Sequence, residues 1–113
     1  MITYTDVVNE LPAIIATRGE DFVYEYPSGS GGTCMYVWDG KPDCLIGCYL
    51  ASKGVPLEAF EHFETCAIDD AYAAGKVPIA ITPEALTLLA RIQRYQDDDF
   101  TWGISFINAI EGN

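Results

Sequence analysis

Apolar residues recur at helical spacing along most of this chain, in segments that glycine and proline cut short. The first segment places Val7, Leu11 and Ile14 on one face, contains Pro12, and meets Gly19 at its end. Proline inside a helix removes a backbone donor and predicts a kink, and glycine is a natural helix end. No apolar run approaches the roughly 18 residues that cross a bilayer. The pattern therefore predicts several short helices around one core.

Two aromatic segments alternate with the two-residue period of β-strands. They are residues 22–27 (FVYEYP) and residues 33–38 (TCMYVW), and the glycine-rich residues 28–32 lie between them. Strands that follow one another in sequence usually pair. We therefore expect these two segments to form an antiparallel hairpin, and residues 77–81 (VPIAI) to form a short third strand.

Local signals predict two helices after the hairpin. The first begins at Pro42 or Asp43 and runs to about Lys53, where Gly54 ends it. The second begins at Pro56, because proline suits the first position of a helix, and continues to about residue 73. Its buried stripe is expected to contain Leu57, Phe60, Phe63 and Ala67.

Two more helices are predicted in the last third of the chain. Thr82 is a preferred N-cap residue, and Pro83 is a preferred first helical residue. The three aspartates at 97–99 mark a break, and a last helix is expected over about residues 101–110. The side chains of this helix that are expected to face the core are Trp102, Phe106 and Ile110.

The order of these elements predicts the α+β class, with a small antiparallel hairpin or sheet packed on a layer of about four to five helices. The chain has 113 residues, half of them apolar, so we expect a single domain from residue 1 to residue 113. Its first residues carry neither a basic start nor a long apolar run, so no secretory signal is expected and the cytoplasm is the expected compartment.

Cys44 is a candidate nucleophile. It follows Asp43 at a predicted helix start, where unpaired N–H groups and the helix dipole lower the pKa of a thiol. A nucleophilic cysteine also needs a base, and His62 is the single histidine of the chain. The alternative is that Cys44 fills the core, as free cysteine commonly does. The apolar neighbours Leu45 and Ile46 favour that alternative.

Tyr36, Val37 and Trp38, followed after Asp39 by Gly40, lead to Asp43 and Cys44 at this helix start. The arrangement resembles the NlpC/P60 family of thiol peptidases, and the resemblance implies a thiol hydrolase centred on Cys44. That family has Ser-Gly after the cysteine, where this chain has Leu45 and Ile46, and takes its histidine from a downstream strand, whereas His62 lies in a predicted helix. We interpret the match as coincidental and assign no catalytic residue, keeping Cys44 and His62 as the alternative.

A zinc site is a second possibility for the cysteines. Cys44 and Cys48 are four residues apart and share a helix face, as do His62 and Cys66. A tight turn at residues 54–55 would bring the two pairs together in a Cys₃His arrangement. Close packing of small side chains is the favoured alternative. We therefore expect these four residues to cluster, and no metal or other cofactor to be required.

The chain is strongly acidic, with 17 carboxylates, six basic residues and a net charge of −11. Binding to nucleic acid through phosphates needs clusters of Lys and Arg, so direct contact with nucleic acid is not expected. A negative surface attracts a basic or DNA-binding protein, or it serves solubility alone. The partner-binding face is expected to consist of Glu58, Glu61, Glu64, Asp97, Asp98 and Asp99.

A broader set of motifs covers most of the chain: Tyr36, Val37, Asp39–Pro42, Cys44 and Leu45, then Gly54–Leu57, then Gln93, Gln96, Asp97, Trp102 and Gly103. This set resembles small uncharacterised proteins of actinobacteria and their phages. The resemblance implies a phage or accessory-gene origin and no activity. We therefore expect a small acidic accessory protein that binds a basic host protein in the host cytoplasm. A thiol hydrolase and a zinc-stapled interaction module are the alternatives.

Overall fold

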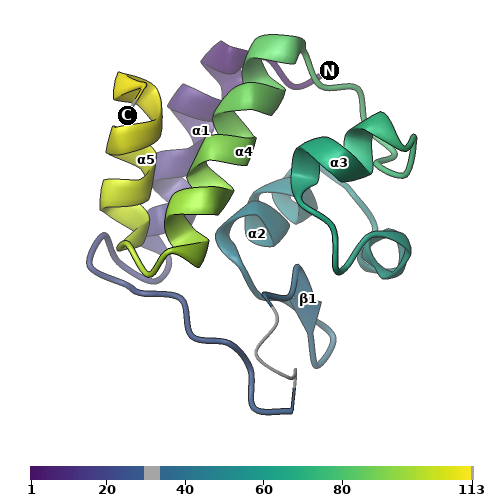
Figure 1. Cartoon of the computed structure of the whole chain (residues 1–113), viewed down its shortest axis with the longest axis horizontal. Helices are drawn as coiled ribbons and strands as arrows, with labels where there is room; N and C mark the ends of the chain where they lie inside the picture. Colours follow the sequence, from purple (N-terminus) through teal and green to yellow (C-terminus); the bar gives the residue numbers. More distant parts are fainter. Residues whose placement is uncertain (30–33, 113) are drawn as a thin grey trace.

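The computed structural model describes residues 1–29 and 34–112 (Figure 1). Over this part of the chain the elements are α1 (Tyr4–Ala16), β1 (Val37–Trp38), β2 (Lys41–Pro42), α2 (Leu45–Ser52), the 3₁₀ helix η1 (Leu57–His62), α3 (Ile68–Ala73), α4 (Pro83–Asp97) and α5 (Trp102–Glu111). The predicted α+β class is confirmed, because a small antiparallel hairpin packs with a set of helices. None of the described helices is long and apolar enough to cross a membrane.

α4 occupies the middle of the fold and packs against α1, α2, α3 and α5. Its start is the predicted one: the Thr82 hydroxyl accepts a hydrogen bond from the Ala85 N–H at 3.3 Å, and Pro83 is the first helical residue. In Figure 1, α1 and α5 lie to the left of α4, and α3 lies to its right. The buried side chains of α4 are Ala85, Leu88, Leu89, Ile92, Gln93 and Gln96.

α1 begins with a reciprocal cap. The Thr3 hydroxyl accepts from the Asp6 N–H at 3.1 Å, and the Asp6 carboxylate accepts from the Thr3 N–H at 2.9 Å. Such a capping box satisfies two helix-end donors at once. Pro12 lies inside the helix, as the sequence predicts. The side chains that α1 buries are Val7, Leu11 and Ile15.

The predicted third strand at residues 77–81 is reduced to one bridge. Ile2 pairs with Ile81 in parallel, and the Ile2 N–H donates to the Ala80 carbonyl at 2.8 Å. The Thr82 N–H returns a bond to the Ile2 carbonyl at 3.0 Å. The start of the chain is thereby tied to the segment that leads into α4.

The predicted hairpin of residues 22–27 with residues 33–38 is wrong. β1 pairs instead with β2, across a two-residue turn at Asp39 and Gly40 whose φ values are +54° and +74°. Aspartate followed by glycine suits a turn in which both central residues have positive φ, and this local signal decides the pairing. Residues 30–33, which fall within the predicted loop and second strand, lie outside the described residues.

The predicted continuous helix from residue 57 to about residue 73 is also wrong. η1 ends at His62, Phe63 takes φ −145°, and α3 begins only at Ile68. Of the expected buried stripe, Phe60 and Phe63 are buried, Leu57 is partly buried, and the expected burial of Ala67 is wrong, because it is exposed at the start of α3. α3 has no side-chain cap from its own N-cap residue, Ala67.

α5 begins where the sequence predicts, with the Thr101 hydroxyl accepting from the Ile104 N–H at 3.1 Å. Trp102 is buried as expected, but the expected burial of Ile110 is wrong, because its side chain is exposed. Phe106 is only partly buried. The helix instead buries Ser105 and Ala109, whose small side chains allow close packing against α4.

Candidate functional site

Cys44 is fully buried, as the sequence predicts, and it forms the N-cap of α2. Its Sγ accepts a weak hydrogen bond from the Gly47 N–H at 3.4 Å. Burial raises the pKa of the Cys44 thiol well above its ordinary value. An activated thiol needs access and a lowered pKa, and this one has neither. His62, its proposed base, lies exposed on η1.

The Cys₃His arrangement that Cys44, Cys48, His62 and Cys66 would need for a zinc site is not present among the described residues. The part of the chain that the structure describes holds no group of three or more His, Cys, Asp or Glu side chains arranged to bind a metal ion. The cluster required two long helices folded back on each other, and η1 followed by α3 does not supply the second. Cys48 Sγ instead lies 3.9 Å from the backbone carbonyl oxygen of Asp43.

The side chains of two glutamines of α4 accept hydrogen bonds from the first residues of two other helices. Gln93 Oε1 accepts from the N–H of Ile68, the first residue of α3, and Gln96 Oε1 accepts from the N–H of Leu45, the first residue of α2, both at 2.8 Å. The glutamines are three residues apart, so they share a face of α4. Gln93 Nε2 also donates to the Tyr36 hydroxyl at 2.8 Å. The Gln-x-x-Gln segment noted in the sequence is therefore part of the scaffold.

Two adjoining hollows lie where the segment leading into α3 meets the C-terminal half of α4. Their volumes are about 230 and 290 Å³, and both are lined by Ala67, Gln93 and Asp97. Arg94 is the one basic residue among their described lining residues. We call the carboxylates that line them the acidic groove; they belong to Glu64, Asp69, Asp70, Asp97 and Asp98.

Two carboxylates of the acidic groove are partly buried. The Glu64 carboxylate accepts hydrogen bonds from the N–H groups of Tyr36 and Val37 at 2.6 and 3.1 Å, yet burial raises its pKa above the ordinary value. Burial likewise raises the pKa of Asp97, whose Oδ1 accepts from Gln96 Nε2 at 2.9 Å. Within residues 1–29 and 34–112 the only ion pair joins Lys53 to Glu10, so neither of these carboxylates has a basic partner.

The helix dipoles stabilise some of the groove carboxylates and destabilise others. Asp69 and Asp70 lie in the first turn of α3, where negative charge is favourable. Asp97 and Asp98 lie at the C-terminal end of α4, where it is unfavourable. The α4 end of the acidic groove therefore concentrates negative charge at a position that costs stability.

The structure divides the predicted partner-binding face. Glu64, Asp97 and Asp98 line the acidic groove, and Glu64 has a structural role as well. Glu58 and Glu61 lie exposed on η1, outside the lining of the two hollows. Asp99 is exposed in the turn between α4 and α5. Asp69 and Asp70 also line the acidic groove, because the packing of α3 on α4 brings them beside Asp97.

Comparisons of the chain with protein-family models, with curated proteins and with solved structures found no match. The shape and charge of the molecule itself are therefore what support a function.

Proposed function

We propose that this protein acts by binding, and that a basic segment of a partner protein lies in its acidic groove. One observation carries the proposal: five carboxylates line two adjoining hollows that hold Arg94 as their one described basic residue. A hollow of this kind offers a Lys or Arg side chain both shape and opposite charge. The net charge of −11 speeds encounter with a basic partner over a longer range.

Binding would relieve two costs in the free protein. Burial disfavours the charged forms of Glu64 and Asp97, and a cation within a few ångströms favours them again. Asp97 and Asp98 also face the negative end of the α4 dipole, which a cation compensates. The same charges repel phosphates, so a basic protein is a better partner than a nucleic acid.

The resemblance to proteins of actinobacteria and their phages supports a phage-encoded accessory protein. In that case the partner is a basic protein of the host cytoplasm, such as a DNA-binding protein. Occupying the basic surface of such a protein with carboxylates would compete with its own anionic ligand.

The test compares two variants of equal net charge. Asp97→Asn with Asp98→Asn neutralises the α4 end of the groove, and Glu58→Gln with Glu61→Gln removes the same charge from η1. The groove variant loses its unfavourable helix-end charges, so it stays folded. The probe is a fluorescein-labelled peptide of alternating lysine and alanine, read by anisotropy at low and moderate salt.

The groove variant should weaken binding by about tenfold and the η1 variant by about twofold, with the difference shrinking as salt rises. Equal weakening by both variants would mean that overall charge alone attracts the peptide, and the acidic groove would be rejected as a site. The same pair of variants then serves to select a natural partner, because a protein captured from host lysate through the groove is lost only with Asp97→Asn and Asp98→Asn.

A further inference from the structure

α5 carries its large apolar side chains on the outside. The helix buries Ser105 and Ala109, while Ile104, Ile107 and Ile110 are 44%, 50% and 37% exposed. The three isoleucines are three residues apart, so they form one stripe along the helix. Single exposed apolar residues are ordinary, but a continuous stripe on a strongly acidic protein is typical of an interaction surface.

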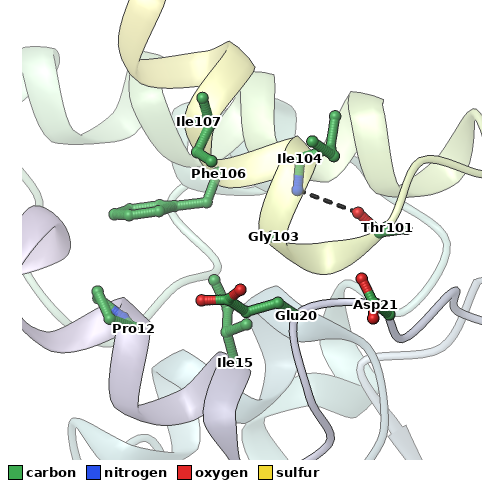
Figure 2. A pocket seen from close by; sticks show the side chains of 9 residues that line it. All are labelled: Pro12, Ile15, Glu20, Asp21, Thr101, Gly103, Ile104, Phe106 and Ile107. Carbon is green, nitrogen blue, oxygen red and sulfur yellow. Dashed lines mark hydrogen bonds between the residues drawn. The ribbon is translucent and has the colours of Figure 1, made fainter.

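The stripe borders a cleft between α1 and α5 with a volume of about 320 Å³. Figure 2 shows Pro12 and Ile15 of α1 on one side of the cleft, and Phe106, Ile104 and Ile107 of α5 on the other. The walls are thus mainly apolar, and each is supplied by a helix.

Two carboxylates lie at the end of the cleft where α5 begins. They belong to Glu20 and Asp21, both exposed, and no basic side chain occurs among the described residues that line the cleft. The Gly103 N–H donates to the Glu20 carbonyl at 2.9 Å. A Cβ at Gly103 would lie 3.0 Å from that carbonyl oxygen, so glycine permits the close approach. The two carboxylates are therefore held beside the first turn of α5.

We propose that this cleft is a second docking surface, separate from the acidic groove, for an amphipathic helix of a partner protein. The apolar face of that helix packs on Ile104, Phe106 and Ile107, and a Lys or Arg near one of its ends pairs with Glu20 and Asp21. The two surfaces are independent, because α1 and α5 lie on one side of α4 and α3 lies on the other (Figure 1).

Charge decides between a partner helix and a second copy of this chain. Each copy carries a net charge of −11, and self-association through this face would press two strongly acidic surfaces together. The described lining of the cleft offers no basic group to offset that repulsion. A helix with an apolar face and a basic end satisfies both the isoleucine stripe and the carboxylates.

The probe is a synthetic helical peptide of about 18 residues, with leucines at helical spacing on one face, glutamine and alanine elsewhere, and two lysines at one end. A matched peptide carries two glutamates in place of the lysines. Binding is measured by titration calorimetry and located by backbone amide chemical shifts. Ile107→Glu tests the cleft, and its half-exposed position leaves the fold intact. Tyr4→Glu is the control, because it replaces an exposed apolar residue at the far end of α1 by the same charge.

The lysine peptide should shift the amides of α5 and of residues 20–22, and should bind more tightly than the glutamate peptide. Ile107→Glu should weaken it by about tenfold and Tyr4→Glu by less than about twofold. Glu20→Gln with Asp21→Asn should abolish the preference for lysine over glutamate. The acidic-groove variant Asp97→Asn with Asp98→Asn should bind the lysine peptide as the wild type does.

Four results would overturn the proposal. Shifts confined to α3 and the end of α4 would place the peptide in the acidic groove. Unchanged binding by Ile107→Glu would remove the isoleucine stripe from the interface. A wild-type dimer in sedimentation, made monomeric by Ile107→Glu, would show that a second copy covers the cleft. Loss of lysine-peptide binding on Asp97→Asn with Asp98→Asn would likewise count against a separate surface.

Discussion

Gly47 of α2 lies directly against the backbone of Tyr36. A Cβ at Gly47 would collide with the carbonyl group and the Cα of Tyr36. The Tyr36 carbonyl is already fixed, because it accepts from the Asp43 N–H at 2.8 Å. Glycine is therefore required for α2 to pack on the residue that leads into β1.

Gly47→Ala is expected to destabilise the protein by about 2 kcal/mol, although alanine is the better helix former by about 1 kcal/mol, because overpacking against fixed backbone costs about 1–3 kcal/mol or more. Urea unfolding followed by far-UV circular dichroism measures the change. Ala51→Gly, one turn further along α2, is the control and should cost only its helix propensity, about 1 kcal/mol. A Gly47→Ala protein that is as stable as the wild type would show that the contact is not tight.

Gln93 and Tyr36 form the centre of a buried polar network, because the Tyr36 hydroxyl accepts from Gln93 and donates to the Cys66 carbonyl at 2.7 Å. Gln93→Leu leaves the Ile68 N–H without its partner, so we expect a loss of about 2–4 kcal/mol. In a Tyr36→Phe background the loss should be smaller, since one bond is already gone. A double-mutant cycle of unfolding free energies measures the coupling, and strictly additive effects would contradict it.

Asp97 should make stability depend on pH in an unusual direction. Burial raises its pKa, so the folded state holds the proton more tightly than the unfolded state does. The free energy of unfolding that Asp97 contributes therefore falls as pH rises from the ordinary carboxyl pKa through the raised one. Asp97→Asn keeps an oxygen for Gln96 Nε2 and should gain stability over the wild type across that range.

Unfolding curves of both proteins between about pH 3 and about pH 7 test this expectation. Asp98→Asn, which removes one charge from the exposed neighbour, is the matched control for the loss of one charge. A gain for Asp97→Asn that is the same at every pH would contradict a raised pKa.

Cys44 should be the last of the four cysteines to react with a maleimide in the native protein. Its side chain is fully buried, whereas Cys34, Cys48 and Cys66 are partly exposed. Burial and the raised pKa both keep the reactive thiolate scarce. Peptide mapping by mass spectrometry gives the rate at each site, and labelling in denaturant serves as the reference. Native labelling of Cys44 as fast as that of Cys66 would restore Cys44 as a candidate nucleophile.

The sequence predicted α4 and α5 well because their start signals are local. Thr82 and Thr101 each cap an N–H three residues further on, and Pro83 has its φ already set for a helix. Such signals lie within one turn, so no knowledge of packing is needed. The Asp39-Gly40 turn is a local signal of the same kind, because aspartate and glycine tolerate the positive φ values that this turn needs.

The start of α3 could not be predicted in the same way, and that of α2 was predicted at Pro42 or Asp43 instead of Leu45. Ile68 and Leu45 donate to glutamines that follow them by 25 and 51 residues. No pattern within the segment of residues 57–73 indicates that the chain turns at Phe63. The apolar spacing fits one long helix equally well. The hydrogen bond from the Ile68 N–H to Gln93 favours a new helix that begins at Ile68.

The candidate surfaces were predictable only in part. The excess of carboxylates indicated an acidic binding face, but the acidic groove exists only because α3 packs beside the end of α4. The cleft at α5 was missed because apolar residues surround that helix, and their spacing does not distinguish the face of Trp102, Ser105 and Ala109 from the face of the isoleucines.

The two glutamines of α4 also set an order of events during synthesis. α2 and α3 have eight and six residues, too few to persist as isolated helices, and both are synthesised before Gln93 and Gln96. Truncation after residue 80 should therefore leave residues 45–73 without helical signal, which circular dichroism of that fragment can check. Residues 45–73 should therefore fold only after the last third of the chain has been synthesised.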